Sequence, residues 1–175
     1  SSADWVEACT GSGECNDVCP ENINVRRWLS ILNLKRKVRT RPQEERRAAG
    51  DELFRTMAQA VRLLASMQMP NQDRDALLAP GRGRKADLVF YYGCNILRSP
   101  HLIFNVMDIL DAIGIEHEVI GGTANCCGVL QYMSGDLGTY ERIAGRTAGT
   151  FEAMGAKEVL SWCPTCQIQF GENYN

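Results

Sequence analysis

The sequence predicts an α/β fold, in which a parallel doubly wound sheet is preceded by a small helical segment. From Asp87 onwards, short apolar runs of strand length alternate with longer runs of helical spacing. Strands and helices in this alternation usually form a parallel sheet with right-handed crossovers. The first run, residues 88–92, is apolar throughout, which is typical of a strand buried on both faces.

Three strands and two crossover helices are predicted in this C-terminal half. The strands are expected at residues 88–92, 115–120 and 158–162. Pro100 favours the start of the first helix, and Gly114 favours its end. The second helix is expected over residues 137–154, with Gly155 directly after it.

The N-terminal half is predicted to be helical. Asn24 is suited to cap a helix whose apolar residues recur at helical spacing, namely Val25, Trp28, Leu29 and Leu32. Pro42 favours the start of a second helix, and Pro70 favours its end. The apolar stripe of this second helix is expected to run through Leu53, Phe54, Met57, Val61, Leu64 and Met67. Residues 71–85 are predicted to be a linker, because they include Pro80, Gly81 and Gly83.

Composition excludes some classes of function. With 175 residues, 45% of them apolar, the chain can form one α/β domain of ordinary size plus a small appendage. The net charge of −2 gives no electrostatic argument for binding nucleic acid. No apolar run approaches the ~20 residues of a membrane-spanning helix. We therefore expect a cytoplasmic protein, which would associate with a membrane only through partner subunits.

The positive charge is unevenly distributed along the chain. Nine Lys or Arg lie between Arg26 and Arg47, against two acidic residues, Glu44 and Glu45. One interpretation is a solvated helix face. The other is a docking patch for an acidic electron-transfer partner.

Five of the eight cysteines follow the predicted strands, each group coming after a carboxyl end: Cys94, Cys126, Cys127, Cys163 and Cys166. Because ligands of open α/β sheets bind outside the carboxyl ends of the strands, we expect these five thiols to gather at one edge. Gly93 and Gly128 would allow the backbone to turn closely around an inorganic group. The array is typical of a metal-thiolate site, and iron–sulfur chemistry fits it best.

Other interpretations of the cysteines remain open. Five thiolates are one more than a cubane [4Fe–4S] cluster requires, so either one thiol is free or the cluster is unusual and uses a bridging sulfur. A structural zinc site would use four ligands. Disulfides are a further alternative, but disulfide-stapled domains are usually small and poor in helix, unlike this chain.

The other three cysteines stand near the start of the chain, as Cys9, Cys15 and Cys19 followed by Pro20. Their spacing is that of the ferredoxin sequence C-x2-C-x2-C-x3-C-P, with Ser12 in place of the second cysteine. In two-cluster ferredoxins the cysteine before proline ligates the other cluster. We therefore expect a partner motif before Ser1, and interpret the chain as a fragment of a longer polypeptide.

These residues resemble the cysteine-rich CCG-domain family, which includes catalytic subunits of heterodisulfide reductase and iron–sulfur subunits of glycolate and lactate oxidation systems. The resemblance covers Asp87 to the C-terminus, with all five motif cysteines. Residues 5–40 are similar to the second ferredoxin motif of the adjoining heterodisulfide reductase subunit, which is fused to the CCG part in some members.

The resemblance implies that the five motif cysteines hold a noncubane [4Fe–4S] cluster, which in catalytic members is the site of disulfide chemistry. Members with disulfide chemistry carry two CCG motifs, whereas this chain shows one. A ferredoxin-type cluster is implied near Cys9, Cys15 and Cys19. With only three local thiolates it would be a [4Fe–4S] cluster with an oxygen ligand from Ser12, a [3Fe–4S] cluster, or absent.

We expect three parts in the chain. Residues 1–40 form a ferredoxin-type segment, the second half of a longer domain; residues 41–86 form a helical connector and linker; and residues 87–175 form the CCG domain, cut short at its C-terminus. The expected function is that of an oxidoreductase subunit, active within a complex of flavin- or iron–sulfur-containing redox subunits, that acts on a small sulfur substrate. The alternatives are an electron relay for a flavin-dependent glycolate or lactate dehydrogenase, and a zinc-stabilised interaction domain.

Overall fold

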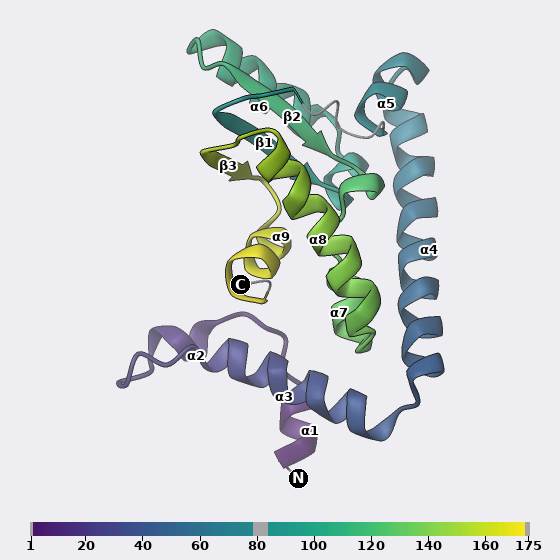
Figure 1. Cartoon of the computed structure of the whole chain (residues 1–175), viewed down its shortest axis with the longest axis vertical. Coiled ribbons are helices and arrows are strands. Elements are labelled where there is room, and N and C mark those ends of the chain that lie inside the picture. Colours follow the sequence, from purple (N-terminus) through teal and green to yellow (C-terminus); the bar gives the residue numbers. More distant parts are fainter. Residues whose placement is uncertain (1, 79–83, 174–175) are drawn as a thin grey trace.

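A parallel sheet of three strands forms the core of the C-terminal half (Figure 1). The computed structural model of the chain describes residues 2–78 and 84–173. The strands are β1 (Leu88–Gly93), β2 (His117–Gly121) and β3 (Glu158–Ser161), in the order β2-β1-β3. Both neighbours pair in parallel with β1, and the register with β2 shifts between Tyr91 and Gly93. The predicted α/β class is confirmed, with helices making up most of the described chain.

Helices pack on both faces of β1, because successive side chains of a strand point to opposite faces. Phe90 and Tyr92 belong to one core cluster with residues of α4 (Gln43–Gln68) and α6 (His101–Ala112). Val89 and Tyr91 belong to a second cluster, which includes residues of α8 (Leu137–Ala153) and the C-terminal segment. Residues 89–91 are consequently inaccessible to solvent.

The N-terminal half is helical, as predicted. Its first three helices are α1 (Ser2–Glu7), α2 (Glu14–Asp17) and α3 (Val25–Thr40). The side chain of Asn24 accepts a hydrogen bond from the backbone N–H of Arg27, which satisfies one free donor at the start of α3. In Figure 1, α4 runs alongside the C-terminal half, and α3 crosses near the end of α7 (Val129–Ser134).

The prediction of a linker over residues 71–85 was wrong in its first part. Residues after Pro70 form α5 (Asn71–Leu78), because Leu77 and Leu78 pack against the same core cluster as α4 and α6. The hydroxyl of Tyr92 also donates a hydrogen bond to the backbone carbonyl of Leu77. Residues 79–83 of the expected linker lie outside the described residues.

The apolar stripe expected on α4 was wrong in part. Leu53 and Met67 are exposed, whereas the buried positions of α4 are Gly50, Val61 and Ala65. A side chain at Gly50 would lie 2.8 Å from the hydroxyl oxygen of Ser134, because α4 and α7 cross closely there. Small residues therefore face the partner helices, and α7 was itself not expected from the sequence.

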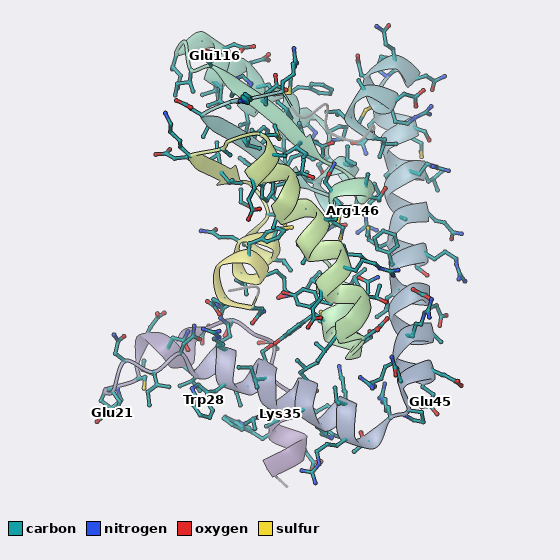
Figure 2. The ribbon with its side chains drawn as sticks, in the orientation of Figure 1. Glu21, Trp28, Lys35, Glu45, Glu116 and Arg146 are labelled. Carbon is teal, nitrogen blue, oxygen red and sulfur yellow. The ribbon has the colours of Figure 1, made fainter. Side chains whose placement is uncertain are left out.

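Several basic side chains of α3 and α4 hold these helices against the C-terminal half. Arg26 forms an ion pair with Glu172. The Nζ atom of Lys37 donates a hydrogen bond, at 2.7 Å, to the carbonyl of Met133, and Arg46 donates one to the carbonyl of Gly135. Part of the basic stretch thus has partners within the chain. Trp28 and Lys35 are exposed instead, on the side of α3 that faces away from the C-terminal half (Figure 2).

None of the helices in the described residues has the length and apolar character needed to cross a membrane.

Candidate metal centre

Each strand of the sheet leads into a segment that carries cysteines. Cys94 follows β1 directly, and Cys126 and Cys127 follow a single helical turn after β2. Cys163 comes two residues after β3 and caps α9 (Pro164–Ile168), which carries Cys166. Four of these thiols are at most 8% exposed, and Cys163 is half-buried. The parallel topology therefore brings residues from three distant parts of the sequence to one edge of the sheet.

The five thiols lie close together. The sulfurs of Cys94 and Cys126 are 3.8 Å apart. Cys127 and Cys166 belong to one buried cluster, and Cys163 packs against it. All eight cysteines are free thiols. Within the described residues, however, no three His, Cys, Asp or Glu side chains are arranged as ligands around a single metal ion.

Hydrogen bonds between the thiols separate their pKa values. Hydrogen bonds from Cys127 and Cys94 lower the pKa of Cys126 to about 3, although burial acts in the opposite direction. A hydrogen bond from Cys166 lowers the pKa of Cys163 to about 6. The pKa values of the other three are raised, first of all by hydrogen bonding to these neighbours: Cys94, Cys127 and Cys166. Hydrogen bonding thus favours the thiolate form of Cys126 and Cys163 and the thiol form of the other three.

Glycine is required on both sides of this site, for two different reasons. Gly93 has φ +72°, and a side chain there would lie 3.2 Å from the sulfur of Cys166 and 3.3 Å from the Cβ atom of Cys163. The lack of a side chain at Gly93 thus lets these two cysteines lie close to the backbone. Gly128 has φ +77°, but a side chain there would meet the ring of Tyr140 at 3.0 Å. Its backbone N–H lies 3.4 Å from the sulfur of Cys126, as a hydrogen-bond donor.

Three side chains that the sequence motifs did not single out fix the loop between β2 and the vicinal cysteines. The hydroxyl of Thr147, on α8, donates a hydrogen bond to the carbonyl of Cys126 at 2.9 Å. Arg146 donates one to the carbonyl of Ala124 at 2.6 Å, and is labelled in Figure 2. The hydroxyl of Tyr91, on β1, donates one to the carbonyl of Asn125 at 2.8 Å. The loop is therefore held from both the sheet and α8.

The N-terminal cysteines are arranged differently. Cys9 is exposed, and Cys15 and Cys19 are half-buried. Ser12, in the position of the missing ferredoxin cysteine, is exposed. Cys9 lines a cleft of about 240 Å³ between the N-terminal helices and the C-terminal half, together with α3 residues such as Arg26 and Lys37. The structure brings the five downstream thiols close together and leaves the N-terminal three closer to the surface.

The donor set at the sheet edge fits an iron–sulfur group. All of its potential ligands are sulfur, which is the donor that such clusters use. Five thiolates packed this closely would repel one another, and hydrogen bonding to neighbouring thiols is the first cause that raises the pKa of Cys94, Cys127 and Cys166. Iron ions would supply the positive charge that allows the remaining thiols to ionise.

Comparison with known proteins agrees with this site. The family model named CCG, the cysteine-rich domain, matches residues 88–171. One of the subunits of the dihydromethanophenazine:CoB–CoM heterodisulfide reductase of Methanosarcina acetivorans is 27% identical over 175 aligned positions, which cover 93% of this chain. The chain spans about 40% of the length of that relative. No solved structure matches the chain. Residues 88–171 therefore belong to the cysteine-rich CCG domain family.

Proposed function

We propose that the chain is an iron–sulfur redox subunit of the heterodisulfide reductase type. Its five clustered thiols would hold a noncubane [4Fe–4S] cluster: Cys94, Cys126, Cys127, Cys163 and Cys166. The observation that carries this proposal is their convergence from three strand ends into one buried, all-sulfur site. The CCG match and the similarity to a heterodisulfide reductase subunit support the same assignment.

The substrate proposed for this site is a small disulfide or thiol. A cubane cluster ligated by four thiolates has no open coordination position and serves as an electron relay. A fifth thiol allows the ligation of one iron to change, and this is what sulfur chemistry at the metal would need. Cys163 is the most accessible of the five thiols, so a substrate sulfur would approach the site from the side of Cys163.

We also propose a second cluster near Cys9, Cys15 and Cys19. Ser12 stands where the ferredoxin motif has its second cysteine. This cluster would pass electrons between redox partner subunits and the CCG site.

We also propose that the sheet is doubly wound and that the three parts of the chain are residues 1–40, 41–86 and 87–175. The packing of helices on both faces of β1 supports the first of these.

Anaerobic purification of the chain, with iron and sulfide analysis and EPR, tests the proposed cofactor. We expect about four irons per CCG site. Replacing each of the five cysteines by serine should reduce the iron content or, at the labile position, retain iron and abolish turnover with a disulfide substrate. Cys94 and the vicinal pair are the candidates for that position. Cys9→Ser, which changes the proposed N-terminal cluster, should lower only the iron of that cluster and leave the EPR signal of the CCG site unchanged.

Two results would redirect the assignment. Zinc in place of iron would indicate a zinc-stabilised interaction domain. If every variant that retains iron also retains full disulfide-linked turnover, the cluster is a relay. A subunit serving a flavin-dependent hydroxy-acid dehydrogenase would then replace the present proposal.

A further inference from the structure

The cleft between the N-terminal helices and the C-terminal half has a partly apolar lining. Its volume is about 240 Å³. Four apolar side chains line it from three helices: Leu29 and Leu34 of α3, Val129 of α7 and Ile168 of α9. Binding sites for small molecules are typically concave and largely apolar, with a few polar groups that fix the orientation of the ligand. A small organic molecule would therefore find an apolar surface here against which its own apolar part can be buried.

The charged side chains that line the cleft carry a net positive charge. Arg26, Arg27 and Lys37 contribute three positive charges, and Glu172 contributes the one negative charge among the described lining residues. Arg26 forms an ion pair with Glu172, so Arg27 carries the excess charge at the start of α3. Lys37 lies about 15 Å further along the axis of α3, as expected for a separation of ten residues. A small ligand near the first turn of α3 would therefore meet one unbalanced positive charge.

A buried amide supplies a hydrogen-bond donor to the same cleft. Gln169 lines the cleft and is 2% exposed. Its side-chain oxygen accepts a hydrogen bond from Asn173. Its side-chain nitrogen, Nε2, has no hydrogen-bond partner in the part of the chain that the structure describes. Because a buried donor without a partner destabilises a fold, an acceptor atom supplied by a ligand would be favourable here.

We propose that this cleft binds a short-chain carboxylate, with its acid group held by Arg27 and Gln169 and its alkyl chain against the apolar side chains of α3, α7 and α9. A guanidinium group matches a planar carboxylate, and one negative charge balances the one excess positive charge. The Nε2 atom of Gln169 would donate to a carboxylate oxygen. None of the five clustered thiols is among the described residues that line the cleft. The inference therefore goes beyond the proposed function and does not depend on it.

Three probes separate the two parts of this ligand. Hexanoate has the acid group and the chain, acetate has the acid group without the chain, and hexanol has the chain without the charge. Titration calorimetry of the anaerobically purified chain should show that hexanoate binds at least about tenfold more tightly than either of the others. Added salt should weaken hexanoate binding, because it screens a partly exposed charge pair. Equal affinities for hexanoate and hexanol, or no binding of hexanoate, would overturn the proposal.

Matched variants of α3 locate the acid group. Arg27→Gln removes the charge in the cleft but keeps the cap of the helix, which uses the backbone N–H of this residue. Lys35→Gln makes the same change of charge on the side of α3 that faces away from the C-terminal half (Figure 2). Arg27→Gln should weaken hexanoate binding by about tenfold and leave hexanol binding unchanged, whereas Lys35→Gln should change neither. Gln169→Met, which removes the donor at similar size, should weaken hexanoate binding by about fivefold. Equal effects of Arg27→Gln and Lys35→Gln would contradict this location.

The iron content of the same preparation distinguishes this inference from the proposed function. Hexanoate binding to a chain that takes up no iron would contradict the proposed function and leave the inference standing. An iron-loaded chain that binds no hexanoate would overturn the inference and leave the cluster assignment intact.

Discussion

Replacing Gly93 by alanine should damage the metal centre more than it damages the fold. Gly93 connects β1 to Cys94, and its φ of +72° lies in the left-handed region. An added Cβ atom would lie 3.2 Å from the Cys166 sulfur and 3.3 Å from the Cys163 Cβ atom. Both distances are shorter than ordinary van der Waals contacts, so the two cysteines must move or the backbone must shift.

The magnitude can be estimated from two contributions. Placing an L-residue in the left-handed region costs about 1–2 kcal/mol, and the reduced entropy of the unfolded chain returns about 0.4–1 kcal/mol. Overpacking at a tight site adds about 1–3 kcal/mol. Gly93→Ala should therefore lower the free energy of unfolding by about 1–5 kcal/mol. At about 2–4 °C for each kcal/mol in a chain of this size, the melting temperature should fall by roughly 2–20 °C.

Gly114→Ala is the matched control. Gly114 has φ +71°, close to that of Gly93, but an added Cβ atom would meet nothing within 4 Å. In Gly114→Ala, the free energy of unfolding should fall only by the backbone contribution, about 1 kcal/mol. Urea unfolding of the metal-free variants measures the stability, and iron per chain after anaerobic reconstitution measures the site. Gly114→Ala should load iron normally, whereas Gly93→Ala should not. Equal stability and equal iron loading in the two variants would refute the idea that Gly93 makes space for the cofactor.

Two further predictions concern individual side chains. In the metal-free protein the pKa of Cys163 is lowered to about 6 by its hydrogen bond from Cys166. Since the thiolate is the form that reacts, alkylation of Cys163 should rise through pH 6, well below the pH of about 8.5 at which thiols ionise in the unfolded chain. Mass spectrometry of labelled peptides would show this, and labelling that begins only above pH 8 would contradict it. Ser12→Cys should raise the iron content and convert any [3Fe–4S] EPR signal towards a [4Fe–4S] one. No change in either would mean that Ser12 does not face a cluster.

The strands and the cysteine groups were predictable because each rests on a local signal. A continuous apolar run identifies β1, and a glycine or proline bounds the neighbouring helices. The convergence of the five thiols follows once the strands are parallel, since their carboxyl ends then share one edge. The spacing of the cysteines alone therefore predicts a shared site.

Features that depend on the packing of distant helices were not predictable in this way. The buried face of α4 is set by close approaches at Gly50 and Ala65, which a search for large apolar residues passes over. The basic stretch was interpreted as a solvated face or a docking patch. Arg36 instead pairs with Glu7 at 2.7 Å, and Lys37 reaches the Met133 carbonyl. Charge reversal at these positions would disturb internal contacts, so Lys35 is the residue of that group with which a docking role can be tested cleanly.

Tyr91 and Tyr92 show why the environment of the site needed the structure. The two residues are chemically identical and adjacent, yet the hydroxyl of Tyr91 donates to the carbonyl of Asn125, directly before Cys126, and that of Tyr92 donates to the carbonyl of Leu77 in α5. Strand periodicity alone requires only that they point to opposite faces. Two features decide the face of the sheet on which the vicinal cysteines lie. One is the side on which α8 packs, and the other is the direction in which the loop before Cys126 turns. Thr147 and Tyr91 fix that loop from opposite sides. The convergence of the five cysteines can thus be expected from their spacing, whereas the side chains that hold the neighbouring loop are determined by the three-dimensional packing around it.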